Sequence, residues 1–178
     1  MQERRKTRTK AFRFNVSLLE GLERAADNTG MSQNAFMGEL LADRLLVDPL
    51  VRAFHGIGLS DETFQSILGS TDADAVEMAG SEMARKNFPL VCELYRTSGQ
   101  ILAFREFLIE ILGKHAGWFH MEDDGDGTQR SMTLTHSFGR KWSIFVKSYI
   151  LSAHSTISKD KMSIEIADQF IRIDFSPT

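Results

Sequence analysis

The sequence is poor in cysteine and proline and has no long apolar run. With a single cysteine, Cys92, among 178 residues, it can form neither an internal disulfide nor a cysteine-rich zinc module. No stretch approaches the roughly 18 consecutive apolar residues that a membrane-spanning helix needs. The first residues are charged where a secretory signal peptide would be apolar. We therefore expect a globular protein of the cytoplasm with no membrane partner.

Positive charge is slightly outweighed by negative charge overall, and it is concentrated at one end of the chain. The 21 lysines and arginines are outnumbered by 24 aspartates and glutamates, which gives a net charge of −3. The first 13 residues carry six basic side chains and one acidic side chain, so this arm has a charge of +5 and the rest has −8. A basic arm on an acidic body is typical of nucleic-acid contact, because only the arm attracts phosphates. Charge alone leaves open a solvated tail with no partner.

The arm leads into a short strand pattern. Polar and apolar residues alternate over residues 9–14, so Phe12 and Phe14 share one face of a strand. The opposite face carries Thr9, Ala11 and Arg13. A single strand needs a hydrogen-bonded neighbour, and nothing nearby in the sequence provides one.

Two helix patterns follow the strand. Asn15 or Ser17 is a suitable N-cap for a helix that ends at Gly30. Ser32 then caps a second helix that ends before Pro49. Two short helices and one strand bury little apolar surface. We therefore expect an intertwined homodimer in which the strand pairs antiparallel with its copy and four helices share one core.

This N-terminal unit resembles the ribbon-helix-helix family of DNA-binding proteins (MetJ/Arc/CopG type). The resemblance covers residues 8–47. The matching residues are Phe12, Arg13 and Phe14 in the strand, Leu18, Leu19, Leu22 and Ala26 in the first helix, and Gly30, Met31, Ser32, Asn34 and Phe36 in the turn and second helix. The spacing from Phe14 to the turn glycine is also similar to that of the family.

The resemblance implies that the paired strands enter the major groove of double-stranded DNA, where outward side chains read base edges. The positions that would read bases are Thr9, Ala11 and Arg13. Arg13 suits a bidentate contact to guanine, and Thr9 can donate or accept a hydrogen bond. Ala11 departs from the polar residue that is usual there and could contact only a thymine methyl group.

Phosphate contacts are expected from the arm and, by the same resemblance, from the N-terminus of the second helix. Backbone amides at a helix N-terminus bind phosphate through their unsatisfied N–H groups and the helix dipole. The expected phosphate-binding residues are Arg4, Arg5, Lys6, Arg8, Lys10, Ser32, Gln33 and Asn34. Lys10 faces inward by strict alternation, so its amine would reach a phosphate by extending around the strand.

We expect three segments along the chain: a ribbon-helix-helix domain over residues 1–50, a linker over 51–58, and a second domain over 59–178. The pattern of the second domain predicts helices first, with one helix ending before Pro89 and another running from Ser98 to Gly117. Further elements are expected as strands over 118–121 and 131–138, a helix over 139–152, and a bent strand or hairpin over 162–175. The fold class is α+β, with several helices and a small antiparallel sheet in the C-terminal domain. This domain resembles no family that we recognise.

Two groups of residues in the second domain are candidate metal sites. His120 and His136 lie on the two arms of the expected hairpin and could face each other, as a divalent transition metal would require. An ordinary pair of polar histidines is the alternative. The acidic loop over residues 122–127 partly matches a calcium-binding loop, but the twelfth position is Thr133 instead of glutamate. A solvated hairpin loop is the better interpretation.

No pattern indicates catalysis, and we expect the protein not to be an enzyme. Cys92 lies among apolar residues, which is typical of a buried side chain and not of a nucleophile. The sequence therefore predicts a dimeric or larger, nucleoid-associated, sequence-specific regulator of transcription, a repressor, whose second domain is a sensor or assembly module for an unidentified effector. Two alternatives are an antitoxin-like interaction protein that regulates its own synthesis and a DNA-architecture or plasmid-partition protein.

Overall fold

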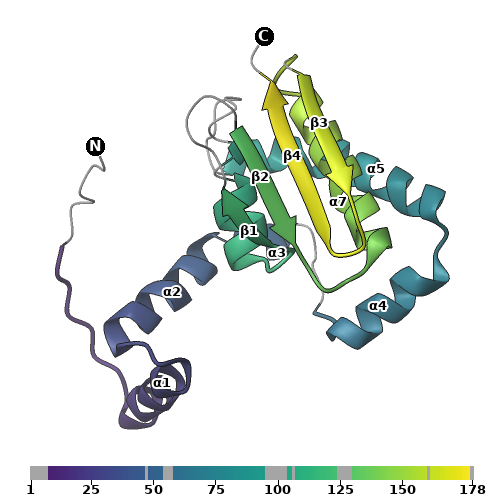
Figure 1. Cartoon of the computed structure of the whole chain (residues 1–178). Helices are drawn as coiled ribbons and strands as arrows, with labels where there is room; N and C mark the ends of the chain where they lie inside the picture. The colour runs from purple at the N-terminus through teal and green to yellow at the C-terminus, as the bar shows by residue number, and fades with distance from the viewer. Residues whose placement is uncertain are drawn as a thin grey trace. The chain divides into compact units, whose positions relative to one another are not determined.

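The computed structural model describes residues 8–46, 48–53, 58–94, 104–105, 107–123, 130–159 and 161–176 (Figure 1). The chain folds as two compact units, Met1–Arg44 and Leu45–Thr178. The division therefore falls before residue 50, and the start of the expected linker is helical.

The first unit contains two capped helices, α1 (Val16–Thr29) and α2 (Gln33–Leu46). Asn15 caps α1, since its side-chain oxygen accepts a hydrogen bond of 2.8 Å from the backbone N–H of Leu18. Gly30 ends the helix with a φ of 68°, a left-handed conformation that glycine adopts without strain. Both helices lie where the sequence predicts them.

Residues 8–15 form neither helix nor strand in the single chain. The strand expected over residues 9–14 is therefore not formed in the single chain, and the ribbon of the expected ribbon-helix-helix dimer is not shown. The physical reason is that a β-strand exists only when its N–H and C=O groups pair with a neighbouring strand. Within the described part of the chain, the sheet pairings involve residues 120–176 alone.

The second unit is α+β, as expected. Its helical elements are α3 (Asp48–Ala53), α4 (Asp61–Ser70), α5 (Ala73–Leu94), the π-helical segment η1 (Phe107–His115) and α7 (Arg140–Ser155). Its strands are β1 (His120–Asp123), β2 (Arg130–Thr135), β3 (Lys161–Ile166) and β4 (Phe170–Ser176). No helix among the described residues is long and apolar enough to cross a bilayer.

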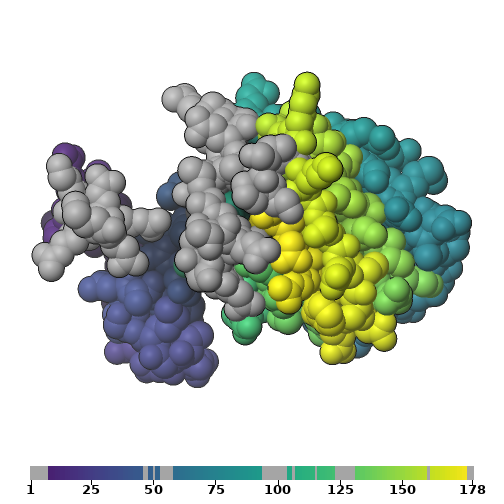
Figure 2. Space-filling model, turned by 45° about the horizontal axis from the view of Figure 1, so that its top comes forward, coloured from purple at the N-terminus to yellow at the C-terminus, as the bar shows by residue number. Residues whose placement is uncertain are grey.

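The four strands form an antiparallel sheet in the order β1-β2-β4-β3. The segment 162–175 is thus a hairpin and not one bent strand. Met132 and Leu134 on β2 lie opposite Ile173 and Ile171 on β4, and all four are fully buried. Arg172 lies between the two isoleucines in the sequence, and its side chain is exposed on the opposite face of the sheet. Figure 2 shows β3 and β4 at the surface. One face of the sheet therefore packs on the core beneath α7, and the other meets solvent.

Helix α5 corrects one expectation, because it continues through Pro89 to Leu94 instead of ending before the proline. A proline inside a helix removes one backbone hydrogen bond. Pro89 itself is exposed, while Phe88 and Val91 on either side of it are buried in the core. The ring of Phe88 packs edge-on against Phe104, with 5.6 Å between centroids. Burial of these side chains offsets the missing hydrogen bond.

Helices α5 and α7 pack closely at Gly80, and we expect Gly80→Ala to destabilise the second unit by about 1–3 kcal/mol. A Cβ at this position would overlap the backbone carbonyl oxygen of Phe145 and lie 3.1 Å from the Cβ of Ser148. A helix backbone cannot give way locally, so the two helices would have to separate. Urea unfolding of the full chain measures the change in the free energy of unfolding.

Gly69→Ala in α4 is the matched control. A Cβ there would meet nothing within 4 Å, and alanine favours helix over glycine by up to about 1 kcal/mol. A Gly80→Ala protein as stable as Gly69→Ala would contradict the close packing of α5 on α7.

Candidate functional site

Most apolar side chains of the first unit are exposed, and nearly all of the others are only half-buried. Among residues 8–44, Ala26 is the only buried residue. Phe12 is 66% exposed, Val16 71% and Leu18 55%, although Phe12 and Leu18 lie on the faces that the sequence predicts to be apolar. An exposed apolar surface of this kind is typical of an interaction site.

The segment before α1 places its two phenylalanines together. The ring centroids of Phe12 and Phe14 are 6.2 Å apart, so both side chains lie on the same side of the segment. This agrees with the period of two that the sequence predicts there. The residues predicted to read bases, Thr9, Ala11 and Arg13, are all exposed.

The residues predicted to contact phosphate divide into two groups. Arg8 and Lys10 are exposed, and Arg4, Arg5 and Lys6 lie outside the described residues. At the start of α2, the Ser32 hydroxyl accepts a hydrogen bond of 3.2 Å from the N–H of Ala35. Gln33 and Asn34 then form the exposed end of the helix, whose first turn contains no acidic side chain. No carboxylate in this first turn opposes a phosphate electrostatically.

The two candidate metal-binding histidines are not opposite each other. The register of β1 and β2 places His120 opposite Thr135, one residue short of His136. His136 is half-buried beyond the end of β2. Its Nδ1 accepts a hydrogen bond of 3.3 Å from the backbone N–H of Phe138, so its Nε2 donates to the Ser143 hydroxyl at 2.9 Å.

Both ring nitrogens of His136 are thus occupied by protein partners, and the expectation of a facing histidine pair is wrong. Among the residues that the structure describes, no group of three or more histidine, cysteine, aspartate or glutamate side chains could hold a metal ion. The acidic loop considered for calcium lies largely outside the described residues, as residues 124–129 are not among them.

Burial lowers the pKa of His136 below its usual value of 6.5. We expect stability of the second unit to fall as the pH falls through about 6.5, because the unfolded chain then binds a proton that folded His136 resists. His136→Gln should flatten this pH dependence. Urea unfolding of wild type and variant between pH 7.5 and 5 measures the slope, and an equal slope in wild type and His136→Gln would contradict the assignment.

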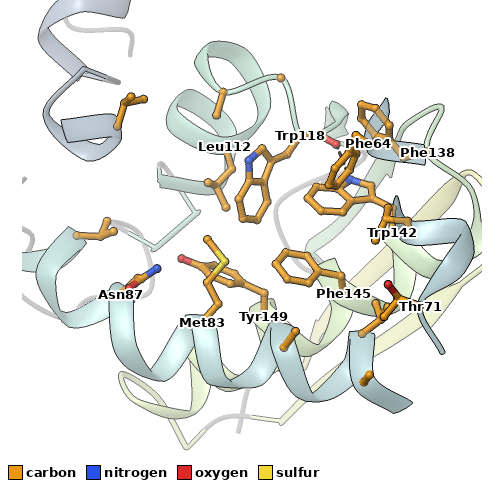
Figure 3. A pocket seen from close by; sticks show the side chains of 18 of the residues that line it. Phe64, Thr71, Met83, Asn87, Leu112, Trp118, Phe138, Trp142, Phe145 and Tyr149 are labelled. Carbon is orange, nitrogen blue, oxygen red and sulfur yellow. Dashed lines mark hydrogen bonds between the residues drawn. The ribbon is translucent and has the colours of Figure 1, made fainter. Parts of the chain in front are cut away.

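The second unit contains a cavity of about 630 Å³ (Figure 3). Its walls come from α3, α4, α5, η1, α7 and the segments before β1 and before α7. Aromatic side chains dominate them: Phe64, Phe107, Trp118, Phe138, Trp142, Phe145 and Tyr149. Trp118 packs edge-on against Trp142 at 5.2 Å and against Tyr149 at 5.4 Å.

Sequence reasoning missed this cavity, since Trp118, Trp142 and Tyr149 match the pattern of ordinary core residues. One signal was present: Trp142, Phe145 and Tyr149 follow each other at helical spacing, so a single face of α7 is aromatic. Cys92, in contrast, is half-buried against the core, in agreement with a packing role.

Comparisons of the chain with models of protein families, with curated proteins and with solved structures find no match.

Proposed function

We propose that this protein is a homodimeric, sequence-specific DNA-binding regulator of transcription, a repressor of the ribbon-helix-helix kind. The observation that supports the proposal is the exposed apolar surface of the first unit. The basic segment that precedes α1 in the sequence pairs with no strand among the described residues. A second copy supplies both missing parts, since each copy offers the same strand and the same two helices. The pairing would bury Phe12 and Phe14 and turn the opposite face of the ribbon outward.

In this dimer the outward face of the ribbon carries Thr9, Ala11 and Arg13 from each copy. A two-stranded ribbon fits the major groove, where the base edges present a distinct pattern for each base pair. Arg13 has the bidentate geometry that guanine O6 and N7 accept. Specificity would therefore depend mainly on Arg13 and Thr9, because the Ala11 methyl group can make only an apolar contact.

The phosphate backbone would be held on both sides of the ribbon. The N–H groups of Gln33 and Asn34 at the start of α2 have no partner within the helix, and the helix dipole favours an anion there. Arg8 and Lys10, together with the arginines and lysine of the preceding arm, add charge that is independent of sequence. These contacts would set the register of the protein on DNA, and the ribbon would choose the site.

The second unit favours a regulator over an antitoxin. An antitoxin-like tail folds on its target and has little core of its own. Residues 45–178 instead form a compact unit, with buried residues from α5, η1, α7 and the sheet in one cluster. The proposed role of this unit is to sense or to assemble, without catalysis.

The test is selection of bound duplexes from a random pool by the full-length protein, followed by a genome-wide footprint. We expect one enriched motif with two-fold symmetry, at discrete positions beside promoters. Binding that spreads along DNA with no enriched motif would favour the DNA-architecture or partition alternative, and no binding to any duplex would reject the proposal.

A further inference from the structure

The cavity of the second unit is large and aromatic. Its volume of about 630 Å³ lies within the range of small-molecule sites. None of the lining residues that the structure describes is charged, and apart from the indole N–H groups the polar side chains among them are Thr71, Asn87 and Tyr149. A charged ligand would lose its hydration here with no opposite charge to compensate. The chemistry of the walls therefore selects an uncharged ligand.

The arrangement of the aromatic rings favours a ligand that itself contains a ring system. Trp142 and Phe145 are stacked, with 4.9 Å between centroids and 8° between planes, and Trp118 lies at an angle to them at 5.2 and 5.8 Å. Flat faces and edges of this kind pack on planar molecules. A protein helix is about 10 Å wide with its side chains, so no more than about two turns of helix would fit into the cavity.

Two of the three polar side chains, Asn87 and Tyr149, lie at one end of the cavity, and Thr71 lies at the other end (Figure 3). In Figure 3 the hydroxyl of Tyr149 and the amide of Asn87 point toward the same end, away from Trp142 and Phe138. Burial, with a smaller contribution from nearby Cys92, raises the pKa of Tyr149, so its hydroxyl stays protonated and can donate a hydrogen bond. A ligand with one hydrogen-bonding group at one end would be oriented by this pair.

We propose that this cavity binds an uncharged, ring-containing, largely apolar small molecule, and that occupancy is transmitted to the DNA-binding unit through α3. Val51 of α3 is part of the wall and is 45% exposed, so a ligand would cover it. In the chain, α3 begins two residues after the end of α2. A ligand that holds α3 against the other elements of the second unit therefore restricts the chain that follows the boundary between the two units at residues 44 and 45. This transmission rests on the proposed function, whereas binding in the cavity does not.

The binding test uses full-length protein and two probes that differ by one charged group. N-phenyl-1-naphthylamine is uncharged and fits the cavity, and 1-anilinonaphthalene-8-sulfonate adds a sulfonate to the same ring system. We expect one molecule of the amine to bind per chain, with energy transfer from Trp118 and Trp142, and the sulfonate to bind at least tenfold more weakly. Equal affinity for the two probes, or no saturable binding of the amine, would overturn the proposal.

Two variants locate the probe. Ala79→Phe fills the cavity from the α5 wall, and Ala73→Phe makes the same change on an exposed part of α5 outside the wall. We expect Ala79→Phe to lower affinity for the amine at least tenfold and Ala73→Phe to leave it unchanged. Val51→Glu, at an exposed wall position, gives the same test if Ala79→Phe does not fold. Unchanged affinity in a folded wall variant would overturn the proposal.

A second copy of the chain is the competing occupant of the cavity. In that case affinity for the amine would fall as protein concentration rises, and Ala79→Phe would reduce the oligomeric state in light scattering. Either result would overturn the proposal.

The transmission test measures affinity for the preferred duplex with and without saturating amine. We expect a change of fivefold or more in wild type and none in Ala79→Phe. If the amine binds and the duplex affinity stays constant, transmission through α3 is wrong while DNA binding stands. If the amine binds and no duplex is recognised, the proposed DNA-binding function is wrong while the cavity assignment stands.

Discussion

Replacement of Arg13 by alanine is expected to weaken binding to the preferred duplex by about 1–3 kcal/mol for each half-site, roughly 5- to 150-fold for each contact that is lost. The reason is that the variant cannot make the bidentate arginine contact to guanine at one base pair in each half-site. Binding to random duplexes should change much less, since that binding depends on phosphate contacts. The same variant should also tolerate substitution of the contacted base pair. Fluorescence anisotropy with the selected duplex and with its single-base variants measures all three effects.

Two control proteins separate base reading from general attraction to DNA. Removal of Arg4 and Arg5 should weaken binding to every duplex and reduce the salt dependence by about one unit for each phosphate that is no longer bound. Arg24→Ala, on exposed α1 outside the proposed interface, should change neither affinity. If Arg13→Ala and the arm variant weaken specific and random duplexes in equal proportion, the division between base reading and phosphate binding is wrong.

The helices of the first unit were predictable because their ends are encoded locally. Asn15 caps α1 through one hydrogen bond, and Gly30 ends it in a conformation that other residues resist. Such signals depend on residues within one turn of each other. The long α5 was not predictable in the same way, since it passes through Pro89 by virtue of the burial of Phe88 and Val91 against distant elements.

The sheet shows the same limit at the level of register. Alternation predicts strands near residues 118–121 and 131–138, and β1 and β2 lie close to these ranges. The exact pairing depends on the connection between them, and a slip of one residue moves a side chain to the other face. That is why His120 lies opposite Thr135 and the facing pair with His136 does not form.

The cavity could not be predicted from local pattern at all. Its walls combine Phe64 from α4, Trp118 before β1 and Tyr149 from α7, which are far apart in the sequence. An aromatic residue on a buried face gives the same sequence pattern whether its ring is covered by protein or lines a space. Only the summed volumes of side chains from several elements decide between a filled core and a cavity.

The largest effect is expected from loss of the proposed dimer. The double variant Phe12→Ala/Phe14→Ala removes four large apolar side chains from a dimer, each of which contributes about 1.5–3 kcal/mol when buried. Because Phe12 is 66% and Phe14 41% exposed in the single chain, only that part of each ring is newly buried, and dissociation should become easier by about 3–6 kcal/mol, or roughly 200- to 25,000-fold. Light scattering at micromolar concentration should give a dimer for wild type and a monomer for the variant. The variant should also lose affinity for the preferred duplex, although neither phenylalanine is proposed to contact a base.

Phe170→Ala is the matched control, since Phe170 is an exposed phenylalanine of the second unit at 42%. It should leave both the dimer and duplex binding intact. In the single chain, Phe12 is more exposed than Phe170 and Phe14 is about as exposed as Phe170. Their replacement by alanine should therefore change the free energy of unfolding of a monomer little. If the double variant is monomeric and its second unit is unchanged, the strand over residues 9–14 of one chain pairs with the same strand of a second chain. A double variant that stays dimeric and still selects the same duplex would show that residues 9–14 do not pair, and the proposed mode of DNA binding would fail with it.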